Sequence, residues 1–130
     1  MRTKVIAGNW KMNKTPAEAA EFIMELKESV KGIENEIIAA VPFVCIPAAL
    51  TASEGSNIKI AAQNMHWEEK GAYTGEISAP MLKELNIDYV VLGHSERRQY
   101  FNETNETVNK KIKALQLQVI RLLHGADNRT

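Results

Sequence analysis

One run of the sequence concentrates groups that can act on a carbonyl compound. In "YVVLGHSERR", residues 89–98, His94 and several charged residues follow directly after an apolar segment. A histidine at the end of a strand and the start of a helical turn meets the positive end of the helix dipole, which disfavours the imidazolium form. Such a neutral imidazole can donate a hydrogen bond. The alternative interpretation is a structural histidine beside a surface ion-pair group.

A cationic residue follows another apolar segment near the start of the chain. In "AGNWKMN", Asn9 and Lys11 come directly after a strand-like run. Ligands of α/β folds bind at the carboxyl ends of the strands, so Lys11 and His94 are expected at the same end of a parallel sheet. There, neutral His94 and Lys11 would polarise a carbonyl and support an enediolate. The alternative is a solvated loop lysine, with Trp10 beside it in the core or an interface.

A long loop is the third segment of the sequence that could carry a function. The segment from Asn64 to Gly75 shows no pattern of helix or strand. Loops of this length inside a compact domain tend to be functional or to bind a partner. The alternative is a surface excursion in which His66 and Trp67 only pack.

Strand-like and helix-like runs alternate along the chain and must position these residues. Continuous apolar runs at 4–9, 36–41, 58–63 and 89–93 predict strands covered on both faces, as in a parallel sheet. Thr15 as N-cap, Pro16 and Glu18 predict a helix over 16–31. Further helices are predicted over 46–53 and 78–85, the second capped by Ser78. The sequence therefore predicts an α/β fold of four parallel βα units.

The last segment of the chain allows two interpretations. From Thr104, apolar residues recur at spacings of three and four, which indicates a helix as far as Leu123. The part "LQVIRLL", residues 117–123, also alternates well enough to form a fifth strand. Periodicity leaves both open, and residues 125–130 read as a polar tail.

Composition excludes several classes of function. Sixteen basic and sixteen acidic residues give a formal net charge of zero, with no basic arm that would indicate nucleic-acid binding. Cys45 is the only cysteine, so neither an internal disulfide nor a multi-cysteine metal site is expected. The apolar run at 37–50 is too short for a membrane span and contains two prolines. We expect a cytoplasmic protein that acts on a small metabolite, with no bound metal.

Four motifs follow the four predicted strands in order. They are "AGNWKMN", "PFVCIPAAL", "AAQNMHWEEKGAYTGEIS" and "YVVLGHSERRQYFNETNETVNKKIKAL". In this order and spacing they closely resemble triosephosphate isomerase, and the resemblance covers about residues 1–115. It implies part of an eight-stranded TIM barrel that interconverts dihydroxyacetone phosphate and glyceraldehyde 3-phosphate, in glycolysis and gluconeogenesis, without a cofactor.

The resemblance also implies roles for individual residues. Asn9 and Lys11 become substrate-binding residues, with Lys11 directing positive charge at the phosphate and the enediolate. His94 becomes the neutral electrophile at the carbonyl oxygen. Glu96 becomes an auxiliary residue that pairs with Lys11 or assists proton transfer. The loop that carries Thr74 resembles the one that reaches a second subunit, which implies a homodimer.

The sequence departs from the family after Leu115. There the family continues through four more βα units, which supply the catalytic glutamate, the closing loop and the phosphate-binding turns, and none of these has a match here. We therefore expect residues 1–115 to form the four-stranded N-terminal half of the barrel and 116–130 a divergent helical or disordered tail, with little turnover by this chain alone. The alternative is a non-catalytic half-barrel assembly module that pairs with itself or with a separately encoded second half.

Overall fold

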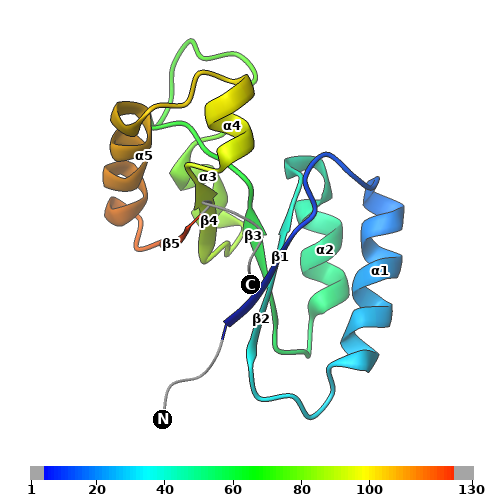
Figure 1. The fold of residues 1–130 in the computed structure, drawn as a ribbon. Coiled ribbons are helices and arrows are strands. Elements are labelled where there is room, and N and C mark those ends of the chain that lie inside the picture. The colour runs from blue at the N-terminus through cyan, green and yellow to red at the C-terminus, as the bar shows by residue number, and fades with distance from the viewer. Residues whose placement is uncertain (1–4, 125–130) are drawn as a thin grey trace. The chain divides into compact units, whose positions relative to one another are not determined.

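The computed structural model describes residues 5–124. Along these residues, helices alternate with five strands that run in the order of the chain (Figure 1). The chain forms two compact units, the first ending at Ala61 and the second beginning at Ala62.

The first unit contains the elements β1 (Val5–Asn9), α1 (Pro16–Ser29), β2 (Glu36–Val41), η1 (Phe43–Cys45), α2 (Ile46–Ser53) and nearly all of β3 (Ile58–Ala62). Strands β1 and β2 pair in parallel, with Val5 opposite Glu36, and β2 lies between β1 and β3. Helix α1 begins with the predicted capping box, in which Thr15 and Glu18 bond to each other's backbone N–H.

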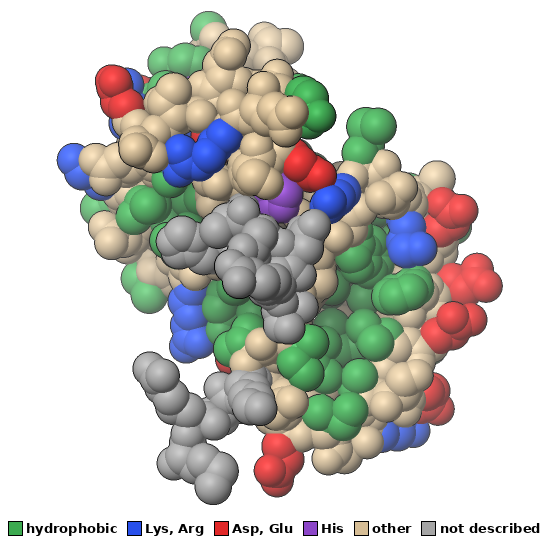
Figure 2. Space-filling model, viewed as in Figure 1, with side chains coloured by type: hydrophobic (Ala, Val, Ile, Leu, Met, Phe, Trp, Pro, Cys, Tyr) green, Lys and Arg blue, Asp and Glu red, His purple; other side chains and the backbone are tan. Residues whose placement is uncertain are grey.

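Apolar side chains from both helices and from β2 form the core of the first unit. Helices α1 and α2 lie side by side (Figure 1). The fully buried side chains include Ile23, Ile38, Val41 and Ile46. The outer strand differs, because Val5 and Ile6 of β1 remain exposed. Figure 2 shows hydrophobic side chains gathered over β1 and the adjoining flank of α1.

The second unit contains α3 (Ala79–Glu84), β4 (Tyr89–Leu92), α4 (Ser95–Tyr100), α5 (Asn105–Leu117) and β5 (Arg121–His124). Strands β4 and β5 pair in parallel, with Tyr89 opposite Arg121, and α5 contacts both strands. The core of this unit includes Met65, Leu82, Ile87, Val90, Leu115 and Ile120.

The four predicted strands and the helices between them are confirmed. For residues 117–123 the sequence allowed either a helix or a fifth strand, and the structure decides between them. Helix α5 ends at Leu117, so a helix as far as Leu123 is wrong, and residues 121–124 form the fifth strand instead. The expected count of four strands is therefore one short of the number in residues 5–124. The segment forms a strand because Leu122 and Leu123 pair in parallel with Val90 and Val91 of β4. Ile120, which precedes the strand, is buried in the core. The predicted polar tail at 125–130 lies outside the described residues.

Candidate active site

His94 lies at the junction of β4 and α4, as the sequence predicts. The preceding residue, Gly93, has a φ of +70°, and His94 is the N-cap of α4. The imidazole Nδ1 accepts a hydrogen bond of 3.1 Å from the backbone N–H of Glu96. Because a backbone amide can only donate, this geometry fits the tautomer in which Nδ1 is the acceptor and Nε2 carries the proton.

The other ring nitrogen of His94 is buried and has no hydrogen-bond partner within residues 5–124. The residue as a whole is 5 % exposed. A buried polar atom without a partner is uncommon and calls for an explanation such as a catalytic role. The Nε2–H group is therefore a donor with no partner among the described residues, and a donor of this kind can polarise a carbonyl that is brought against it.

Glu96 lies beside the same ring. One carboxylate oxygen is 3.6 Å from Nδ1 of His94, which is too long for a hydrogen bond. Since Nδ1 accepts a hydrogen bond from the Glu96 amide, it does not donate one to this carboxylate. The auxiliary role of Glu96 in proton transfer stays a prediction.

Asn9 and Lys11 form a second local arrangement, in the first unit. Asn9 is the last residue of β1, and its Oδ1 accepts a hydrogen bond of 2.8 Å from the backbone N–H of Lys11. Lys11 has a φ of +58°, in the left-handed region. Such a conformation costs a residue other than glycine about 1–3 kcal/mol and is found preferentially at functional positions. Lys14 in the same loop also has a positive φ, of +80°, so the conformation marks this loop and not Lys11 alone.

Trp10 has the packing role that was the alternative for this motif. Its ring meets that of Phe22 edge to face, with centroids 5.3 Å apart, and its backbone N–H donates to Ala40 of β2. The ammonium group of Lys14 lies 4.7 Å from the centre of the Phe22 ring. These contacts anchor the loop after β1 on α1.

The loop from Asn64 to Gly75 has more internal structure than its sequence indicates. The ring of His66 lies between those of Trp67 and Tyr73, with centroids 4.2 and 4.5 Å away. The backbone N–H of His66 donates to the carbonyl of Ile77 at 2.7 Å. Three aromatic rings within eight residues were the signal that could have indicated this packing. Thr74 is exposed near the end of the loop.

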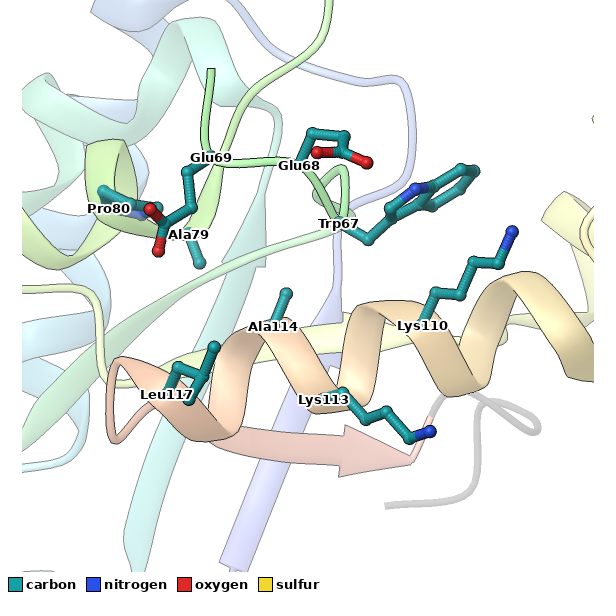
Figure 3. A pocket seen from close by; sticks show the side chains of 9 residues that line it. All are labelled: Trp67, Glu68, Glu69, Ala79, Pro80, Lys110, Lys113, Ala114 and Leu117. Carbon is teal, nitrogen blue, oxygen red and sulfur yellow. The ribbon is translucent and has the colours of Figure 1, made fainter. Parts of the chain in front are cut away.

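A groove of about 260 Å³ lies between this loop, α3 and α5 (Figure 3). Trp67 forms one wall, and the ammonium group of Lys110 is 5.0 Å from the centre of its ring. Ala79, Pro80, Ala114 and Leu117 give the groove an apolar floor. Its two lysines and two glutamates balance, so the groove selects no particular ligand charge. None of the predicted site residues lines it.

The structure thus brings His94 together with Glu96, and Asn9 together with Lys11. The first pair and Thr74 belong to the second unit, and the other pair belongs to the first. The sequence reasoning missed Arg98, whose side chain contacts the backbone of Gly93, and the buried pair Glu103 and Lys111. The sequence does not show that the charges of Glu103 and Lys111 are buried. For Arg98 a signal was present, because a residue four positions after His94 lies one helical turn from it.

Residues 5–124 contain neither a cluster of metal-binding side chains nor a helix suited to a membrane. No cluster of three or more His, Cys, Asp or Glu side chains there is arranged to hold a metal ion. No helix in this part of the chain has both the length and the apolar composition needed to cross a membrane.

Comparisons with known proteins agree on one family. The family described as triosephosphate isomerase matches residues 4–124. The triosephosphate isomerase of Acetivibrio thermocellus is 66% identical over 115 residues, which are 88% of this chain and 46% of that protein. For the one from Clostridium botulinum, identity is 63% over 113 residues, which are 87% of this chain and 46% of that protein. The chain therefore spans about half the length of these relatives.

A solved structure gives the same answer for the fold. The triosephosphate isomerase of Bartonella henselae matches with a TM-score of 0.87 at 35% sequence identity, over 95% of this chain and 51% of that one. This likeness confirms the predicted fold class of parallel βα units that form part of a TIM barrel.

Proposed function

Because this chain belongs to the triosephosphate isomerase family, we propose that it takes part in the interconversion of dihydroxyacetone phosphate and glyceraldehyde 3-phosphate. The reaction, a step of glycolysis and gluconeogenesis, would proceed without a cofactor, in the cytoplasm. The proposal includes the homodimer, with the loop around Thr74 as a contact between subunits. It concerns a whole enzyme of which this chain matches about half.

The hydrogen-bond geometry of His94 is the observation that carries the proposal. Nδ1 accepts the Glu96 amide, and Nε2 keeps a proton without a partner among the described residues. A neutral imidazole oriented in this way donates to the carbonyl oxygen of the substrate and stabilises the charge that develops there as the enediolate forms. Such preorganised donors cost no reorganisation at the moment of reaction.

Lys11 would supply the positive charge that binds the phosphate and the enediolate. Its position two residues after the end of β1 supports this role, because ligands of parallel sheets bind at the carboxyl ends of the strands. The side chain of Asn9 holds the backbone N–H of Lys11 and so fixes the turn that presents the lysine. We assign both residues to substrate binding.

Neither Glu103 nor Glu96 is suited to be the general base that removes a proton from the substrate. A positioned general base contributes about 10²–10⁴-fold to the rate. Glu103 is unsuited to the task, because its carboxylate is buried against the ammonium group of Lys111. Glu96 lies on the Nδ1 side of His94, away from the donor. We place the base in polypeptide beyond these 130 residues, in a longer protein or in a second chain.

The test is complementation with the missing part of a relative. The segment of the Acetivibrio thermocellus protein that this chain does not match would be mixed with this chain, and isomerase rates compared. We expect at least about a hundredfold more activity in the mixture than in either part alone, as a positioned base provides. His94→Gln should abolish the gain, and Gln99→Ala, an exposed change on α4, should keep it. A complex that forms and stays inactive would refute the proposal.

The exposed outer strand β1 favours a second candidate, an assembly module without catalysis. Val5 is 45% and Ile6 is 42% exposed in a strand whose only described partner is β2, and as consecutive strand residues they point to opposite faces of the sheet. Exposed apolar side chains gathered in this way mark protein–protein contacts (Figure 2). In this alternative β1 pairs with a second copy or with a separately encoded half. Sedimentation of the wild type and of Ile6→Lys tests this alternative, since the substitution should dissociate an oligomer that is held together through β1.

A further inference from the structure

Arg98 of α4 bonds to two successive backbone carbonyls at the point where His94 is held. Its backbone N–H donates to the carbonyl of His94 at 3.1 Å. Its side-chain Nε donates to the carbonyl of Gly93 at 3.0 Å. At the far end of the guanidinium, Nη1 donates to Oδ1 of Asn105, the first residue of α5, at 2.8 Å. One side chain therefore ties the end of β4 to the start of α5.

The turn at Gly93 is shaped to receive this guanidinium. Gly93 has a φ of +70°, which favours glycine. A Cβ placed on Gly93 would lie 3.2 Å from Nη2 of Arg98 and 3.4 Å from Val108, so the guanidinium packs directly over the glycine. The carbonyl of Gly93 and the N–H of His94 share one peptide plane. Holding that carbonyl fixes the plane and hence the direction in which the His94 side chain leaves the backbone.

We propose that Arg98 is a positioning residue for His94. The Glu96 amide fixes the ring of His94 relative to the backbone of α4, and Arg98 fixes that backbone relative to β4 and α5. Without the fork of Arg98, the peptide before His94 is free to rotate, and the Nε2–H donor leaves its direction. A lysine at this position keeps the charge but has a single donor group, which cannot reach both partners. This inference rests on the proposed function for its catalytic meaning.

The experiment measures the tautomer of His94 in the full chain. In ¹⁵N-labelled protein, the imidazole nitrogen shifts give the tautomer of His94, with assignment by His94→Gln and with His66 as an internal reference. Hydrogen exchange of the Glu96 amide reports its bond to Nδ1. The variants are Arg98→Lys, Arg98→Met and the milder Asn105→Ala, which removes only the outer bond. Gln99→Ala on the same helix is the matched control.

In the wild type we expect one tautomer, with the proton on Nε2. In Arg98→Lys and Arg98→Met the two nitrogen shifts should approach each other, and the Glu96 amide should exchange about tenfold faster. Asn105→Ala should show a smaller change in the same direction, and this variant decides the matter if the arginine variants do not fold. The amide of Ile120, at the end of α5, should keep its rate.

Wild-type shifts in all three variants would overturn the inference. Equal acceleration at Glu96 and Ile120 would also overturn it, because it would reveal a general loss of stability. The complementation assay separates this inference from the proposed function. An inactive complex, together with a His94 that still responds to Arg98→Lys, would remove the isomerase proposal and leave the positioning role of Arg98 in place.

Discussion

The ammonium group of Lys111 lies 2.7 Å from the carboxylate of Glu103, and both side chains are at least 95% buried. Lys111 also donates to Oδ1 of Asn64 at 2.9 Å, and the hydroxyl of Thr107 donates to the same oxygen of Glu103 at 3.2 Å. The second oxygen of Glu103 faces Nε of Arg97 at 3.7 Å. This buried pair joins the start of the loop after β3 to α5.

Removing one member of this pair should destabilise the protein strongly. In Lys111→Met, the buried carboxylate of Glu103 loses its nearest counter-charge and keeps only Arg97 at 3.7 Å, and we expect the free energy of unfolding to fall by about 3 kcal/mol. Replacing both residues, as Lys111→Met with Glu103→Leu, should recover part of the loss, because no buried charge remains. Urea denaturation followed by circular dichroism measures each difference.

Lys110→Met provides the matched control on the same helix. Lys110 pairs with Glu106 at 3.8 Å on the surface and lies 5.0 Å from the centre of the Trp67 ring, and each of these contacts contributes at most about 1 kcal/mol. A loss in Lys111→Met no larger than in Lys110→Met would show that the buried pair does not stabilise the unit.

The C-terminal ends of α3 and α5 differ in the residue that takes a left-handed conformation. Both helices end in the same motif, in which Ile87 donates to Leu82 and Ile120 donates to Leu115, five residues back in each case. The left-handed residue of the motif is Asn86 (φ +64°) in α3 but Val119 (φ +57°) in α5. A β-branched residue is strained there, and Val119 is 80% exposed, so its side chain gains little from burial.

Val119→Gly should therefore raise the free energy of unfolding by about 1 kcal/mol. Asn86→Gly should change it much less, since asparagine tolerates this conformation. Both values come from the same urea titration. A Val119→Gly variant that is less stable than the wild type would mean that the end of α5 is not strained.

Local signals in the sequence account for most of the elements. Thr15 and Glu18 marked the start of α1, Ser78 marked that of α3, and continuous apolar runs marked the first four strands. The end of α5 was ambiguous because Val119 gives no local stop signal, unlike the glycine or asparagine usual at this position. Only the parallel partner β4 and the burial of Ile120 settle it.

The site was predictable to the extent that its residues follow strands directly. His94 was placed after β4 and Asn9 and Lys11 at the end of β1 in this way, and the structure has them there, while their roles at a substrate stay predictions. The supporting residues were not found, because their roles depend on distant partners. Lys111 and Asn64 are 47 positions apart, and no periodicity relates them. A long polar side chain at a buried position is visible only once the fold is known.

Cys45 should make stability depend on pH in the alkaline range. Burial, together with the nearby carboxylate of Glu18, raises the pKa of the Cys45 thiol above its ordinary value of 9.0. The thiol also donates to the carbonyl of Lys14 at 3.3 Å, which requires the proton. Above the ordinary pKa the unfolded chain loses this proton while the folded chain keeps it, so stability falls as pH rises from about 9.

Comparison with Cys45→Ala isolates this contribution from other alkaline titrations. The wild type should be more stable at pH 7, and the difference between the two proteins should narrow between pH 8 and pH 10.5 in urea titrations at each pH. A difference that stays constant over this range would show that Cys45 ionises equally well in both states.

Two substitutions of Lys11 separate the effect of its backbone conformation on stability from the effect of its charge on activity. Lys11→Gly and Lys11→Ala remove the same ammonium group, but only alanine must strain at a φ of +58°. We therefore expect Lys11→Gly to be the more stable by about 1 kcal/mol. The same pair of changes at Glu21, exposed on α1, should give the opposite order, because alanine favours a helix over glycine. In the complementation assay both Lys11 variants should lose activity alike, since the charge at the phosphate is absent from both. If Lys11→Gly were active, the lysine would be needed only for its backbone, and its place in substrate binding would be wrong.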